Sequence, residues 1–201
     1  MEASWRQTIR NYIQTEARPI EKFGHQPRLY ALARLVGQGH ACDDDVVFAA
    51  AWLHDLGVFI GHRPEDPHEL ARWDNTAYAM RRAPELLRAF GFPEAKIAAV
   101  VEAIRTHQAA CEPIAIEGLI LRDADILEQL GAIAVLRAVC KIGRDNRFTT
   151  FTDAVNSLRK SLATLPAQLR LETARRLAEP KIAALRSFLE SVDAESMEAL
   201  G

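Results

Sequence analysis

The stretch AAAWLHDLG, from Ala49 to Gly57, decides how the rest of the chain is interpreted. It is an apolar run with helical character that ends in the adjacent polar residues His54 and Asp55 and then a glycine. Burying two such groups is costly unless something pairs them, and a bound cation would pair both. For an isolated His-Asp dipeptide a simpler interpretation is favoured, in which His54 caps the last helical carbonyls and Asp55 faces water. Whether this pair is a metal site or a simple helix end therefore depends on the other candidate ligands in the chain.

Helical periodicity extends outward from this stretch over almost the whole chain. Apolar residues recur three and four positions apart, and few segments alternate with period two, which predicts an all-α protein. The Asp-Asp-Asp run at residues 43–45 is expected to begin the third helix, and Pro84 to break the fourth. The predicted helices cover residues 4–17, 27–36, 43–55, 68–90, 93–107, 114–130, 131–141, 151–162 and 166–192.

Length and composition favour one domain. With 201 residues, of which 49% are hydrophobic, the chain can bury one sizeable core. No linker marks a domain boundary, so we expect a single compact helical bundle over residues 1–201. Its core is predicted at about residues 20–145, with the C-terminal helices at residues 151–192 packed on it.

The charge balance and the cysteines exclude several classes of protein. The 25 basic and 27 acidic residues give a net charge of -2, which provides no electrostatic footprint for long nucleic acid or an anionic membrane. The three cysteines are widely separated, and the sequence has neither a signal-like apolar segment nor a run of about 18 apolar residues. We therefore expect a cytoplasmic protein with reduced thiols, acting as a monomer or homodimer.

Two further residues, His25 and Asp125, could complete a metal site with His54 and Asp55. The four residues offer two imidazoles and two carboxylates, a mixed set that suits Mn, Fe, Zn, Ni or Co better than Ca. The negative C-terminal end of the third helix also favours a cation there. Spacing alone favours Asp123 over Asp125 as the inward carboxylate, because Asp123 shares a helical face with the neighbouring apolar residues.

Five short motifs follow one another in a fixed order along the chain. They are His25 with Arg28, Leu53-His54-Asp55-Leu56-Gly57, Ile104-Arg105-Thr106-His107, Asp123-Ala124-Asp125 and Leu130-Gly131-Ala132-Ile133. This order resembles the HD-domain metal-dependent phosphohydrolases, and in particular a subgroup of bacterial predicted HD hydrolases that includes nucleotide pyrophosphatases. The likeness extends over about residues 23–190.

The resemblance implies a metal site and a reaction. One divalent metal (Mn, Fe, Ni, Co, Zn or Mg) would be held by His25, His54, Asp55 and Asp125, with Asp123 either behind the ligands or as the true ligand. The implied reaction is hydrolysis of a phosphate ester or anhydride by a metal-activated water. The substrate would be a small phosphorylated molecule, with nucleotides as the first class to consider.

The same resemblance suggests roles for other side chains. Asp55 and His107 are expected to take part in catalysis, and for His107 the alternative is a core histidine satisfied by hydrogen bonds. Arg28, Arg137 and Lys160 are expected to bind the phosphoryl oxygens of the substrate. The alternative for each of these basic residues is a surface ion pair.

Two other functions remain open from the sequence. A regulatory HD module would bind a metal or ligand without catalysis and keep the metal as a structural site. An HD-fold di-iron oxygenase would need a further histidine near Trp73-Asp74-Asn75, where none occurs, which favours one metal over two. The loop histidines His62 and His68 are expected to be solvated.

Overall fold

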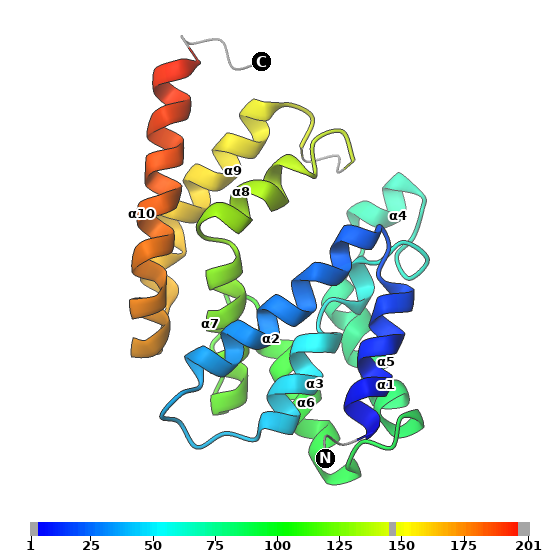
Figure 1. Ribbon diagram of the computed structural model, residues 1–201. Coiled ribbons are helices and arrows are strands. Elements are labelled where there is room, and N and C mark those ends of the chain that lie inside the picture. Colours follow the sequence, from blue (N-terminus) through cyan, green and yellow to red (C-terminus); the bar gives the residue numbers. More distant parts are fainter. Residues whose placement is uncertain (1–3, 145–147, 197–201) are drawn as a thin grey trace. The chain divides into compact units, whose positions relative to one another are not determined.

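The computed structural model describes residues 4–144 and 148–196, which are helical almost throughout (Figure 1). The predicted all-α class is confirmed, because the described residues form ten α-helices and no strand, with one isolated bridge between Ile60 and Arg63. The α-helices are α1 (Ser4–Glu16), α2 (His25–Val36), α3 (Asp44–Leu53), α4 (Pro67–Ala71), α5 (Asn75–Ala89), α6 (Glu94–Thr106), α7 (Ile116–Glu128), α8 (Ala132–Val139), α9 (Phe151–Thr164) and α10 (Glu172–Glu195). Three 3-10 helices connect them: η1 (Ile20–Gly24), η2 (Leu56–Val58) and η3 (Pro166–Gln168).

The chain divides into two compact units. The first is Met1–Arg122 and the second Asp123–Gly201, so that the division falls within α7. The predicted organisation as one domain stays a prediction.

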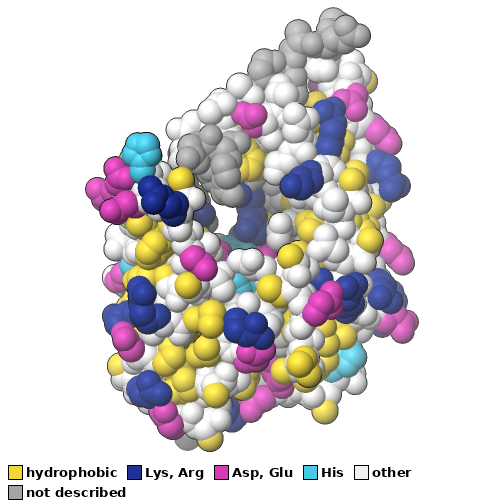
Figure 2. Space-filling model, turned by 180° about the vertical axis from the view of Figure 1, so that it is seen from behind, with side chains coloured by type: hydrophobic (Ala, Val, Ile, Leu, Met, Phe, Trp, Pro, Cys, Tyr) yellow, Lys and Arg dark blue, Asp and Glu magenta, His cyan; other side chains and the backbone are white. Residues whose placement is uncertain are grey.

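The surface mixes both signs of charge. On the face shown in Figure 2, basic and acidic side chains are interspersed, in keeping with the near balance of charges in the sequence. None of the described helices combines the length and the apolar character that crossing a membrane requires.

Helix α3 forms the centre of the first unit. Its residues 46–53 are all buried, with no more than 3% of any of them exposed. A helix that is apolar on every side must be surrounded by other elements, and α3 packs against α1, α2 and α6. Helix α5 then packs on α6 and on η2, which follows α3 in the chain. The end of α3 is therefore held inside the unit rather than at its surface.

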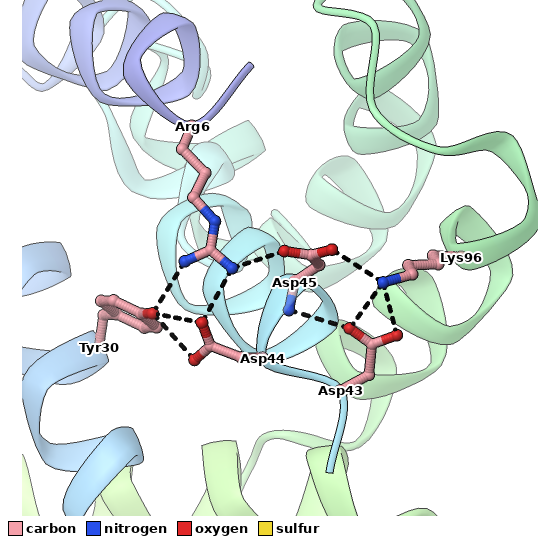
Figure 3. A network of polar contacts seen from close by, with 6 residues as sticks. All are labelled: Arg6, Tyr30, Asp43, Asp44, Asp45 and Lys96. Carbon is pink, nitrogen blue, oxygen red and sulfur yellow. Dashed lines mark hydrogen bonds and ion pairs between the residues drawn. The ribbon is translucent and has the colours of Figure 1, made fainter. Parts of the chain in front are cut away.

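A polar network fastens the N-terminus of α3 to its three neighbours (Figure 3). Its members are Arg6 from α1, Tyr30 from α2, Lys96 from α6 and the three acidic residues Asp43, Asp44 and Asp45. Arg6 contacts Asp44 at 2.8 Å and Asp45 at 2.5 Å, and the Lys96 ammonium lies 2.8 Å from carboxylate oxygens of both Asp43 and Asp45. Asp43 also caps the helix by accepting a hydrogen bond from the Asp45 N–H.

The predicted fourth helix is two helices, and the predicted break at Pro84 is wrong. The interruption lies between α4 and α5 at residues 72–74, and Pro84 lies inside α5. Asp74 explains the position of the interruption, because its side chain accepts a hydrogen bond from the Ala77 N–H and so begins a new helix. A helix that starts at this cap continues through Pro84 while it packs on α6.

The second unit is built from α8, α9 and α10, which pack on one another. Helix α9 begins with a capping box between Thr150 and Asp153. The sequence predicts one helix from residue 166, whereas η3 occupies the first positions and α10 begins at Glu172. The buried residues of α10 follow helical spacing along one side and are Ala174, Ala178, Leu185 and Leu189.

We expect Lys96→Met to lower the free energy of unfolding by about 1 kcal/mol, because it removes the cation shared by Asp43 and Asp45. Burial raises the pKa of Asp45, but Arg6 and Lys96 outweigh it and lower that pKa overall. A carboxyl with a lowered pKa stabilises the fold at neutral pH and loses this contribution as the pH falls. The cost of the substitution should therefore shrink below about pH 4. Urea unfolding at pH 7 and pH 3 measures both effects.

Arg88→Met is the matched control. Arg88 forms an exposed ion pair with Glu94 at 2.9 Å, and neither residue belongs to the network at α3. This control should cost less than Lys96→Met. An equal or larger loss for the control would contradict the bracing role of the network.

Candidate metal centre

His54 and Asp55 lie at the buried end of α3. His54 caps the C-terminus of the helix, and only 1% of it is exposed. Its Nδ1 lies 3.0 Å from the carbonyl oxygen of Ala51, an acceptor, so we infer that Nδ1 carries the proton. The other ring nitrogen, Nε2, then keeps its lone pair. His54 therefore satisfies a carbonyl of the last helical turn and still offers a metal-competent atom.

His25 brings a second imidazole to the same point from the first residue of α2. Its Nε2 lies 3.3 Å from Nε2 of His54, and 5% of His25 is exposed. Oδ2 of Asp55 lies 3.5 Å from Nε2 of His54 and 3.7 Å from Nε2 of His25. Two ring nitrogens and one carboxylate oxygen from two helix ends thus converge within the first unit.

His107 adds a third imidazole from the end of α6. Its ring centroid is 5.0 Å from that of His54, and its Nδ1 lies 2.5 Å from the carbonyl oxygen of Ile104. This repeats the arrangement of His54, because each ring binds a carbonyl three residues earlier at a helix C-terminus. His54, Asp55 and His107 each offer one donor atom, and these atoms lie within 4.8 Å of one another.

The charges around Asp55 keep its carboxyl ionised. Burial acts to raise the pKa of Asp55, but His54, His25, His107 and Lys22 lower it by more, and the result is a pKa well below the usual range. An anionic carboxylate beside three imidazoles, at the negative end of a helix dipole, is a donor set that a divalent cation fits. Nitrogen-rich sets of this kind suit Mn, Fe, Co, Ni or Zn rather than Ca.

His62 anchors the segment that follows Asp55. Its Nδ1 lies 2.9 Å from the carbonyl oxygen of Leu56, and its Nε2 lies 2.9 Å from a carboxylate oxygen of Glu16 on α1. The side chain is 10% exposed. The prediction that His62 is a solvated loop histidine is therefore wrong, because both ring nitrogens have acceptors inside the unit. His68 lies on the exposed surface of α4, as predicted.

Gly57 lies in η2, where the backbone comes very close to α5. A Cβ at this position would lie 2.5 Å from the Asn75 Cα, so glycine is needed for the close approach of η2 to the start of α5. The Trp73 indole N–H donates a hydrogen bond of 2.8 Å to the Gly57 carbonyl. Together with His62, these contacts hold the backbone on the C-terminal side of Asp55.

Two basic residues accompany the cluster in the first unit. Arg28 is half-buried on α2, and its Nη1 would lie 2.9 Å from a Cβ placed on Gly24, so its side chain reaches back along the start of the helix. Lys22 on η1 is close enough to lower the pKa of Asp55, yet sequence analysis did not single it out. The available signal was its position three residues before His25, but a lysine at that spacing has no chemical meaning by itself.

The remaining predicted site residues belong to the second unit. Asp123 is fully buried, and its Oδ2 accepts hydrogen bonds from the backbone N–H groups of Arg170 at 2.9 Å and Leu171 at 2.8 Å. Asp125 is half-buried, and the Gln129 side-chain amide donates to its Oδ2 at 3.1 Å. The roles predicted for both aspartates stay predictions.

The two basic candidates of the second unit differ in their surroundings. Arg137 on α8 contacts the buried carboxylate of Glu128 at 3.3 Å, whereas Lys160 lies on the exposed side of α9. Substrate binding by either residue stays a prediction.

Comparison with solved structures shows the same fold in several bacterial proteins. YpgQ of Bacillus subtilis is 22% identical, with a TM-score of 0.75 over 98% of this chain and 97% of that chain, and a second YpgQ structure is a complex with ADP. Lin1889 of Listeria innocua is 19% identical, with a TM-score of 0.72 over 98% and 97% of the two chains. A predicted HD superfamily hydrolase from an uncultured Thermotogales bacterium is 25% identical, with a TM-score of 0.64 over 94% and 91%.

Comparison with known sequences gives the family. No curated protein matches the sequence. The family model described as HD domain matches residues 23–130, a segment that contains His25, His54, Asp55, His107 and Asp125. Because this match spans more than half of the chain and includes the whole histidine and aspartate cluster, the chain belongs to the HD domain family.

Proposed function

We propose that this protein is a metal-dependent phosphohydrolase that cleaves a phosphate ester or anhydride of a small phosphorylated molecule. The convergence of Nε2 of His25, Nε2 of His54 and Oδ2 of Asp55 at one buried point is the observation on which the proposal depends. Packing alone does not call for polar donor atoms at this point, and a cation is the partner that their chemistry fits.

The proposed ligands are His25, His54, Asp55 and Asp125. Asp125 is preferred over Asp123 because Oδ2 of Asp123 already accepts two backbone N–H groups. When bound, a divalent cation supplies Lewis-acid chemistry, which makes water a better nucleophile and polarises a phosphoryl oxygen. The ionised Asp55 would offset the positive charge of such a cation and would help to hold it at the end of α3.

The other side chains would handle the proton and the phosphoryl charge. Nδ1 of His107 lies against the Ile104 carbonyl, and we assign proton transfer to Nε2, the other nitrogen of this ring beside His54. Arg28 and Lys22 supply positive charge near the cluster for the phosphoryl oxygens, and we retain Arg137 and Lys160 as further proposed contacts.

Nucleotides are the first substrate class to test. Support comes from the YpgQ structure, in which that relative is in complex with ADP. A phosphoanhydride also offers the several anionic oxygens that a cation and basic side chains can share.

Metal analysis tests the site. Wild-type protein loaded with Mn²⁺ and then dialysed should retain about one metal per chain, and His54→Ala should weaken binding at least about tenfold because a ligand is lost. His68→Ala is the matched control, since this exposed histidine lies on α4 and should leave binding unchanged. A wild-type protein that binds no metal, or His54→Ala binding like the wild type, would contradict the metal centre. In a separate sample loaded with iron, two irons per chain with a mixed-valence optical band would instead favour the di-iron oxygenase.

Turnover of a nucleotide panel tests the reaction. Release of phosphate or pyrophosphate should depend on added metal, and His107→Gln should lower kcat by about 100-fold or more while the protein keeps its metal. Unchanged kcat in His107→Gln would remove His107 from the mechanism. Metal-loaded protein that binds nucleotides without hydrolysing any of them would favour the regulatory module.

A further inference from the structure

A fully buried arginine lies on α7 in the first unit. Arg122 is 1% exposed and is among the largest side chains that the structure buries completely. Its chain neighbours Ile120 and Leu121 are buried apolar residues. Removing a guanidinium from water is costly before its contacts are counted, so an apolar side chain would satisfy the packing of this position at lower cost. The arginine therefore calls for a reason other than packing.

One strong contact of Arg122 is with the segment that follows α6. Its Nη2 donates a hydrogen bond of 2.6 Å to the carbonyl oxygen of Ala109. Helix α6 ends at Thr106, and Ala109 is only two residues beyond His107. The backbone of residues 107–115 is not helical, and its hydrogen bond from the Cys111 N–H to the Gln108 carbonyl is local to the segment, so side chains tie the segment to the neighbouring helices.

Three tethers hold consecutive residues of this segment. The His107 ring bonds to the Ile104 carbonyl, and the Gln108 side-chain amide donates to the Thr76 hydroxyl at 2.9 Å, which ties the segment to α5. Arg122 ties Ala109 to α7. The first tether orients the ring, and the other two fix the backbone from which the ring projects.

Helix α7 also packs directly against this segment, which limits how far the Arg122–Ala109 contact can move. A Cβ at Gly118 would lie 2.9 Å from Cβ of Pro113 and 3.0 Å from the Thr106 hydroxyl oxygen. A displacement of residues 107–109 would move the His107 ring relative to His54, whose ring centroid is 5.0 Å away.

We propose that Arg122 is a positioning residue, whose buried guanidinium holds the Ala109 carbonyl and thereby fixes His107 against His54. The effect on rate rests on the proposed function and on the role of His107 in it. The planar guanidinium directs its N–H groups at fixed angles, whereas a lysine ammonium would be a mobile point charge. A misplacement of about 1 Å at a reacting group can cost about 100-fold in rate, so a tether of this kind would be functionally significant.

A double-mutant cycle tests the proposal. Arg122→Met should lower kcat about 10- to 100-fold, with KM and metal content close to wild type. In a His107→Gln background the same substitution should cause no further loss, because its effect acts through His107. Arg122→Lys should recover part of the rate. A loss in the His107→Gln background as large as that in the wild type, or no loss in either, would overturn the proposal.

Arg105→Met is the matched control for these variants. Arg105 lies on α6 next to Thr106 and His107, but it is exposed and pairs with Glu102 at 2.6 Å. Its substitution should leave kcat unchanged. A loss comparable to that of Arg122→Met would show that any arginine near the end of α6 has this effect, and would overturn the specific role of Arg122.

An NMR measurement separates the failure of this inference from the failure of the proposed function. Nitrogen-15 spectra of the imidazole rings should show His107 protonated at Nδ1 in the wild type, and its signals should shift or broaden in Arg122→Met while those of His68 stay in place. This readout needs no substrate and holds even if no nucleotide is hydrolysed. If Arg122→Met fails to fold, Arg122→Lys is compared instead. An unchanged His107 spectrum in the folded variant would overturn the positioning role.

Discussion

The structure of the first unit depends on how two polar side chains are held at the end of a completely buried helix. His54 and Asp55 follow eight consecutive buried residues of α3, where unpaired polar groups would be strongly destabilising. The elements around these two residues are held in place on both sides. The network of Arg6 and Lys96 with three aspartates fastens the start of α3, and His62 and Trp73 bind carbonyls of η2 just beyond Asp55.

The C-terminal ends of α3 and α6 and the start of α2 lie close together at this point. Their position at helix ends explains why histidines suit these places. His54 and His107 both lie at the C-terminal end of a helix, so each ring can bond through Nδ1 to a carbonyl of its own last turn. His25 begins α2 and faces His54 through its own Nε2. A cation at this point would find two ring nitrogens and a carboxylate oxygen close enough together to bind it.

Local patterns made much of the fold and the centre of the site predictable. The helical spacing of apolar residues predicts the helices, and the three aspartates at residues 43–45 predict a helix cap. The adjacent His54 and Asp55 predict a polar cluster. Each of these signals lies within a few consecutive residues. The break before α5 was mislocated because the cap at Asp74 determined where the helix begins, while packing let the helix pass through Pro84. His62, Lys22 and Arg122 were misjudged or missed because their partners are distant in sequence.

The central claim is that His25, His54 and Asp55 hold a divalent cation at the end of α3. Anomalous diffraction from crystals of Mn²⁺-loaded protein, recorded near the manganese absorption edge, tests it most directly. The account predicts one strong peak at coordination distance, about 2.0–2.3 Å, from Nε2 of both His25 and His54 and from a carboxylate oxygen of Asp55. Manganese-loaded crystals with no peak at this position, or with a peak that touches none of these atoms, would contradict it.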